Sequence, residues 1–454
     1  MKRLIFIISL LVAVYLNAKS QDSLSVATKD EVADVKGAVD GINETLQGMI
    51  PTLDALKKIK ISGYIQAQYQ VAESASVASY AGGNFSQNVK SRFQVRRGRF
   101  KINYDNDLTQ YVLQLDVTQN GIGIKDAYAS IKEPWLRLVS LTAGVFDRPF
   151  GFEISYSSSN REAPERSRLF QTLFPGEREL GTKIELMPEN GPLSYFNLKA
   201  GVFNGILNTA NENDRHKDFI GRFGFQLPFE DQGLAIDGGF STYAGTVTNN
   251  SKKIFKIDNA SSIKKYKVDS TSTNLGNGFD RNYYGFDLQL YYDVPVIGGA
   301  TLRGEYIWGK QPGTDKSSSF YNPDAAGASE SKSSIDGKKV ADIYMRNFNG
   351  WYINYVQNIG LKNQFVAKYD VYNSNSDVNA SDIGVTGSNL TAADIKYSTL
   401  GLGWVYHWDA NVKFILYYDW VWNEKVNSLA TGTLAPFKND LKDNVLTLRI
   451  QYKF

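Results

Sequence analysis

One connecting segment, residues 148–180, concentrates charged side chains whose types suggest electrostatic chemistry. It holds five arginines and five glutamates, so its charges cancel. A loop that brings opposed charges into a water-filled passage orients polar solutes and rejects apolar ones. The alternative is that these charges only fasten the loop to a wall through ion pairs. The candidate residues are Arg148, Glu153, Arg161, Glu162, Glu165, Arg166 and Arg178.

A second basic group, Arg97, Arg99 and Lys101, occupies alternate positions of a predicted strand. Side chains two residues apart share one face of a strand, so these three would form a basic ladder that favours anions in a pore. Phe93 shares their parity, and a bulge at Gly98 would resolve the conflict. The alternative is that the three cations pair with acids across the pore.

Catalytic chemistry has little support in the sequence. The chain has no Cys and only two histidines, His216 and His407, which lie far apart. Neither belongs to a recognisable metal cluster or Ser-His-acid arrangement. No Gly-rich loop lies between a strand and a helix to hold nucleotide phosphates. We therefore expect no enzyme activity, no metal site and no cofactor.

The elements that would position these residues are strands with one apolar face. Apolar and polar residues alternate without interruption over the last nine positions, as a strand between lipid and water requires. An amphipathic edge strand of a soluble sandwich is the alternative. The terminal Phe454 resembles the signal by which outer-membrane barrels are recognised for insertion. One face carries Leu446, Leu448, Ile450, Tyr452 and Phe454, and the other carries Thr447, Arg449, Gln451 and Lys453.

The same alternation recurs in segments from Ile61 to the C-terminus. The connections between these segments alternate between short turns and long polar loops. This pattern predicts a 16-stranded antiparallel transmembrane β-barrel over residues 61–454, with both ends on the periplasmic side. The predicted strands are 61–70, 93–104, 110–119, 124–132, 136–147, 181–188, 193–203, 218–228, 233–243, 279–293, 299–309, 347–358, 362–373, 396–408, 411–422 and 443–454.

Three long connections, 244–278, 310–346 and 374–395, are rich in Ser, Asn, Asp, Lys and Gly. Such a composition does not build a core, so we expect mobile external loops.

The first residues indicate export. A basic start precedes the apolar run 4–16, and small residues follow, which predicts a signal peptide over residues 1–20. No later segment is apolar for long enough to form a membrane-spanning helix. The net charge of +3 falls to near zero once Lys2, Arg3 and Lys19 are removed. A neutral mature chain predicts no nucleic-acid partner.

Residues 21–60 predict an oligomerisation helix, because apolar residues recur at alternating spacings of three and four. Thr28 and Glu31 form a capping box that would begin the helix. The seam does not fix the number of paired helices, and a single helix lying on the mouth of its own barrel is the alternative. The seam residues are Val32, Val35, Val39, Ile42, Leu46, Met49, Leu53 and Leu56.

Several barrel motifs resemble the phosphate-selective porins of the O and P type, and their order and spacing carry the resemblance over residues 61–454. It implies a homotrimeric porin of Bacteroidetes type in a Gram-negative outer membrane, which passes small solutes passively. The partners so implied are outer-membrane lipid, lipopolysaccharide and small hydrophilic or anionic solutes. The motifs are 63–66, 93–99, 125–128, 144–153, 165–167, 178–181, 304–306 and 368–370.

The sequence thus predicts a passive outer-membrane porin whose channel is narrowed by the loop 148–180. A preference for phosphate or other anions follows only from the resemblance. The alternative function is a barrel with a closed lumen that serves as a structural anchor or adhesin.

Overall fold

The structure is a computed structural model that describes residues 28–206, 212, 214–319, 332–335 and 338–454. The predicted signal peptide 1–20 lies outside the described residues. The chain divides into two compact units, residues 1–59 and 60–454, which are described separately below. None of the described helices is both long and apolar enough to cross a membrane.

The first unit contains the helix α2 (Lys29–Lys57). Its capping box is present as predicted, since the Glu31 N–H donates to Thr28 Oγ1 at 3.3 Å and the Thr28 N–H donates to Glu31 Oε2 at 3.0 Å. Pro51 lies within the helix. All eight predicted seam residues are exposed on this single copy of the chain, by 49% or more.

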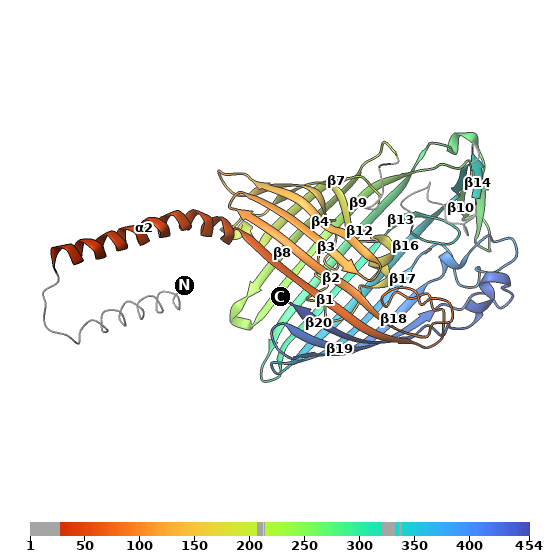
Figure 1. Ribbon diagram of the computed structural model, residues 1–454. Coiled ribbons are helices and arrows are strands. Elements are labelled where there is room, and N and C mark those ends of the chain that lie inside the picture. The colour runs from red at the N-terminus through yellow and green to blue at the C-terminus, as the bar shows by residue number, and fades with distance from the viewer. Residues whose placement is uncertain (1–27, 207–211, 213, 320–331, 336–337) are drawn as a thin grey trace. The chain divides into compact units, whose positions relative to one another are not determined.

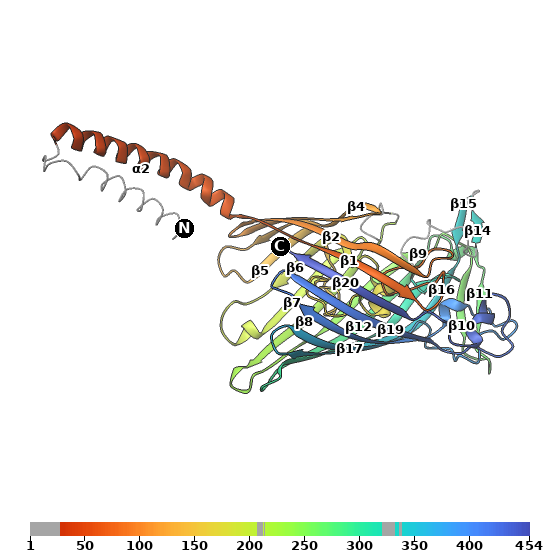
Figure 2. The ribbon, with the colours of Figure 1, turned by 60° about the horizontal axis from the view of Figure 1, so that its bottom comes forward.

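The second unit is a closed antiparallel β-barrel whose described strands number sixteen, as predicted. It closes where β1 pairs with β20, from Tyr64 opposite Lys453 to Ala72 opposite Val445 (Figure 2). The barrel strands are β1 (Ile59–Ala72), β2 (Ser91–Asn106), β3 (Thr109–Thr118), β4 (Gly121–Lys132), β5 (Val139–Asp147), β6 (Arg178–Leu186), β7 (Phe196–Phe203), β8 (Asp218–Phe229), β9 (Leu234–Thr248), β12 (Gly278–Val294), β13 (Gly298–Gly313), β16 (Ile343–Ile359), β17 (Asn363–Asn373), β18 (Tyr397–His407), β19 (Val412–Asn423) and β20 (Val445–Lys453).

Alternation along the strands divides lipid-facing from lumen-facing side chains. In β20, Leu448 and Ile450 are 45% and 43% exposed, whereas Thr447 and Arg449 are 0% and 3% exposed. The apolar side chains point outward, where lipid would cover them, and the polar ones point into the barrel. This division confirms the prediction made from the last nine residues.

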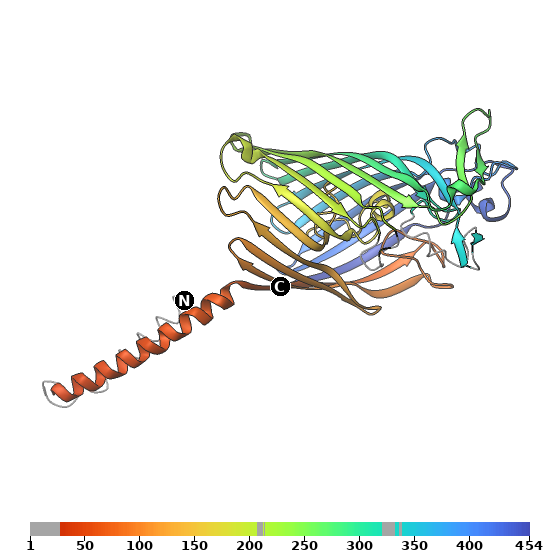
Figure 3. The same cartoon turned by 90° about the horizontal axis from the view of Figure 1, so that it is seen from above.

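Tight turns and long connections lie at opposite ends of the barrel (Figures 1 and 3). β20 ends beside the start of β1, at the end with the tight turns. At the other end, the long connections form two extra hairpins, β10 (Ile254–Asp258) with β11 (Lys265–Asp269), and β14 (Lys332–Ile335) with β15 (Lys338–Ala341). β10 also pairs in parallel with β16 of the barrel wall.

The expectation that the external loops lack a core is wrong for their described residues. Isolated apolar residues from separate connections meet in one buried cluster, and a buried ion pair joins Arg346 to Asp394 at 2.8 Å. Tyr266 donates a hydrogen bond to the same carboxylate at 2.7 Å. The buried members of the cluster are Phe255, Tyr266, Tyr344, Ile383, Leu390, Ile395, Val426, Ala430 and Leu434.

The alternation of inward and outward side chains along β2 shifts by one residue, as the sequence suggests. Phe93 and Phe100 show the shift, since both are exposed although an odd number of positions separates them. The change falls at Arg96 and Arg97, whose side chains both reach the same lumenal carboxylate. Gly98 follows directly, and a Cβ there would lie 2.2 Å from the Val117 carbonyl oxygen of β3. This close approach of two backbones requires glycine.

Candidate functional site in the barrel lumen

The connection between β5 and β6, residues 148–177, crosses the inside of the barrel and contains the short helix α3 (Arg168–Leu173). Glu165 reaches β2 and β20, Glu162 reaches β13, and Glu153 reaches β17. Since these strands lie on different sides of the ring, the segment spans the lumen (Figure 3). We refer to residues 148–177 as the lumenal segment.

Apolar packing attaches one side of the lumenal segment to the barrel wall. Phe174 packs edge-on against Tyr283 of β12 and Tyr243 of β9, with ring centres 5.7 and 6.1 Å apart. Burying one such side chain contributes about 1.5–3 kcal/mol. Sequence alternation shows which residues face inward, but it gives no sign that they would meet a loop. The segment contributes Phe150, Ile154, Leu169, Phe170, Leu173 and Phe174, and the wall contributes Phe203, Ile220, Tyr243, Tyr283, Ile307, Phe348, Tyr352 and Tyr372.

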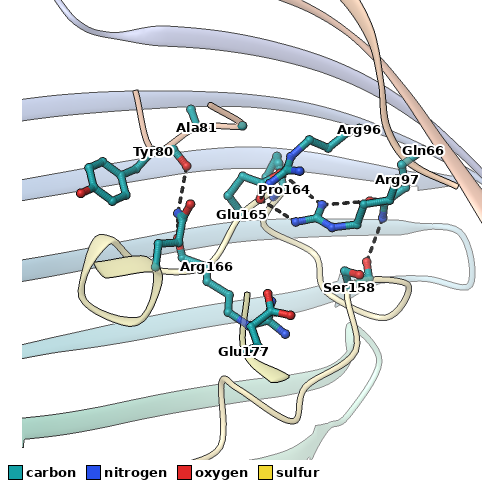
Figure 4. Close-up of polar contacts among 12 residues, drawn as sticks. Gln66, Tyr80, Ala81, Arg96, Arg97, Ser158, Pro164, Glu165, Arg166 and Glu177 are labelled. Carbon is teal, nitrogen blue, oxygen red and sulfur yellow. Dashed lines mark hydrogen bonds and ion pairs between the residues drawn. The ribbon is translucent and has the colours of Figure 1, made fainter. Parts of the chain in front are cut away.

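Charged contacts hold the opposite side of the segment, and Glu165 is their centre (Figure 4). Its carboxylate lies 2.9 Å from Arg96, 2.7 Å from Arg97 and 2.8 Å from Arg449. Burial alone would raise the pKa of Glu165, but the three guanidinium groups hold it well below its ordinary value. Glu165 is therefore a permanent negative charge enclosed by three positive ones.

Glu177 is the centre of a second charged cluster. It forms ion pairs with Arg166 and Lys125, and with Arg178 at 3.1 Å. Arg178 also contacts Asp126 of β4 at 2.8 Å. Arg166, Lys125 and Arg178 outweigh the effect of burial and hold the pKa of Glu177 well below its ordinary value. The structure thus brings predicted residues Arg166 and Arg178 together with Lys125, which sequence reasoning did not select.

The remaining acidic candidates of the segment each pair with a wall residue of a distant strand. Glu153 pairs with Lys368, and Glu162 lies 2.9 Å from Arg303. Arg148 lies 2.9 Å from Glu179 of β6, and both side chains are fully buried. These pairs hold the segment in place, as the fastening alternative proposes.

Two of the three cations of the predicted basic ladder are opposed by carboxylates. Arg97 pairs with Glu165, and Arg99 lies 3.0 Å from Asp116 of β3. Lys101 is half-buried, and among the described residues it has no ion pair. Two of the three charges are therefore neutralised within the wall.

Arg161 lies in the middle of the segment and is 4% exposed. Its three side-chain nitrogens make no hydrogen bond within the described parts of the chain. Burial lowers its pKa to about 9, and the neighbouring cations Arg166 and Arg97 add to the effect.

Open space remains on both sides of the segment. Toward the external loops lies an outer cavity of about 510 Å³, and next to it a narrow inner cavity of about 30 Å³ lies beside Glu165 and Arg166. A third cavity of about 440 Å³ is lined by residues of β3 to β6, including Lys183 and Glu185. No group of three or more His, Cys, Asp or Glu residues is placed to hold a metal ion in the part of the chain that the structure describes.

A family model described as phosphate-selective porin O and P matches residues 75–454. The anion-selective porin from Comamonas acidovorans is 12% identical, covering 87% of this chain and 99% of its own, with a TM-score of 0.50. Pseudomonas putida OprB is 9% identical, covering 88% and 96%, with a TM-score of 0.55. No curated protein matches the chain.

Proposed function

Since the chain belongs to the phosphate-selective porin O and P family and is an outer-membrane porin for solute diffusion in a Gram-negative bacterium, we propose that its lumenal segment is the constriction that selects solutes. The single observation that carries this proposal is that carboxylates of the segment face cations of the wall on several sides, with cavities before and after them. Opposed charges set up a transverse field, which favours small polar solutes that can align with it.

The charge pairs do not favour a strict anion filter. Arg97 forms an ion pair with Glu165, and Arg99 forms one with Asp116. These are two of the cations that the sequence predicted to favour anions. A filter for anions needs cations that no acid neutralises. We therefore propose that polarity and size decide passage, with at most weak discrimination by sign.

Planar bilayers with purified protein test this function. We expect steady conductance steps in KCl and a reversal potential well short of the chloride limit in a salt gradient, because carboxylates of the lumenal segment lie among the cations of the constriction. A barrel that serves only as an anchor or adhesin with a closed lumen should give no conductance steps. A reversal potential close to the chloride limit would contradict the mixed-sign constriction. The family and fold indicate a channel without enzyme activity, and we propose that the chain has no catalytic site.

We also propose that the porin is a homotrimer joined through α2, with outer-membrane lipid and lipopolysaccharide around its apolar outer face. The eight seam residues of α2 are exposed on one copy and recur at coiled-coil spacing. Gly and Pro inside a helix weaken it, each Gly by about 1 kcal/mol and the Pro by about 3 kcal/mol, so α2 is marginal alone and needs partners.

Deletion of residues 22–58 should therefore weaken assembly and yield monomeric barrels. Mass determination in detergent by light scattering measures the change. Substituting Leu46 and Leu53 by Ser should have the same effect, whereas Lys36→Ser and Glu44→Ser, which lie off the seam, serve as controls. An intact trimer after the deletion would assign α2 another role, such as contact with the mouth of its own barrel.

A further inference from the structure

The outer and inner cavities meet at a neck formed by Tyr80, Arg168 and Asp443, which line both. Arg168 is only 9% exposed and Asp443 only 7%. Arg168 Nε donates no hydrogen bond, and Asp443 Oδ1 accepts none, among the described residues. An unsatisfied buried polar atom is costly, so two of them at the border of one cavity require an explanation.

Aromatic packing fixes the position of the cation. The Arg168 guanidinium carbon lies 3.7 Å from the ring centre of Tyr397 and 4.4 Å from that of Tyr80. Rings that stack on a guanidinium hold its plane but leave the N–H donors at its edge available. The guanidinium of Arg168 is therefore available to bind a ligand at the neck, since no carboxylate of the described residues forms an ion pair with it.

The charges on the two sides of the neck have opposite signs. Lys316 and Lys442 line the outer cavity only, and Asp370 and Asp419 line the inner cavity only. None of the four has an ion pair within the described residues, while Glu165, Arg166 and Lys368 of the inner cavity are already paired. The charged groups without an ion pair are therefore basic on the outer side of the neck and acidic on the inner side.

We propose that the neck is a binding site for small zwitterions of the α-amino acid class, with the ligand carboxylate on Arg168 and its ammonium group toward Asp443. This ligand satisfies both orphaned groups. A simple anion or a simple cation would satisfy only one of the two orphaned atoms and leave the other without a hydrogen bond. The site rests on the proposed porin function, since it lies on the solute path.

Equal concentrations of L-alanine, propionate and propylammonium, of matched size, test the site in single-channel recordings of the full chain at pH 7 and constant ionic strength. L-alanine should reduce the KCl current saturably, and the two singly charged compounds should not. Arg168→Gln and Asp443→Asn should each raise the half-blocking concentration of L-alanine about tenfold. The control variants Arg137→Gln and Asp231→Asn, on exposed turns at the other end of the barrel, should leave it unchanged.

Block by propionate equal to that by L-alanine would overturn the zwitterion site in favour of an anion site, and absence of any block would remove it altogether. Unchanged block in both neck variants would also overturn it. In each case the KCl conductance of the wild-type protein still reports the porin function independently. Should a neck variant fail to insert, calorimetry of L-alanine against propionate on the wild-type protein in detergent decides the same question.

Discussion

Removing the lumenal segment should raise the single-channel conductance about threefold, because a sixteen-stranded barrel encloses an aqueous channel unless something fills it. The Arg148 N–H donates to the Glu177 carbonyl at 3.3 Å, so the two ends of the segment are already within hairpin distance. Replacing residues 149–176 by Asn-Gly would close β5 and β6 with a two-residue turn. Planar-bilayer recordings in KCl measure the result.

A matched control shortens a connection outside the lumen, such as the exposed turn 190–194 between β6 and β7. This variant should keep the wild-type conductance. If the variant without residues 149–176 conducts no more than the wild type, the narrowest point lies elsewhere, and the cluster of external loops becomes the next candidate. The aromatic wall that the deletion uncovers should also lower the urea concentration needed to unfold the barrel.

Glu165→Gln should shift the channel toward anions and destabilise it. The substitution leaves Arg96, Arg97 and Arg449 around a neutral side chain. Breaking a buried charge cluster in this way costs about 3–5 kcal/mol. The uncompensated positive charge should roughly double the chloride-to-potassium permeability ratio. Reversal potentials in a KCl gradient measure the selectivity, and urea unfolding in detergent measures the stability.

Glu189→Gln is the matched control, because Glu189 pairs with Lys132 at an exposed turn. Exposed pairs contribute about 0–1 kcal/mol, so neither selectivity nor stability should change measurably. An unaltered reversal potential in Glu165→Gln would place the Glu165 cluster outside the conduction path. The loss of stability without any change in selectivity would leave the cluster a purely structural role.

The strands could be predicted from the sequence because each carries its own evidence. Alternation within about ten residues, as in 446–454, reports the lipid and water faces directly, and all sixteen predicted strands overlap observed ones. Likewise, Thr28 and Glu31 lie three residues apart, so the start of α2 is a local property. Local patterns therefore sufficed for the architecture.

The partners of the site could not be predicted in the same way. Glu165 and Arg449 are 284 residues apart in the chain, and no local pattern joins them. The aromatic wall around Tyr283 faces inward by parity, but only the folded chain shows that Phe174 packs on it. In the external loops, Ile383 and Leu390 are isolated in polar sequence, and a core appears only when Phe255 and Tyr344 join them from other loops.

The position of Glu165 has a consequence for the closure of the barrel. Arg97 belongs to the second strand and Arg449 to the last, and only β1 separates them in the closed ring. Pairing of the final strand with the first therefore brings the positive charges of Arg97 and Arg449 close together in a space with little water. The carboxylate of Glu165 lies between them and removes this repulsion, so the lumenal segment also stabilises the seam at which the ring closes.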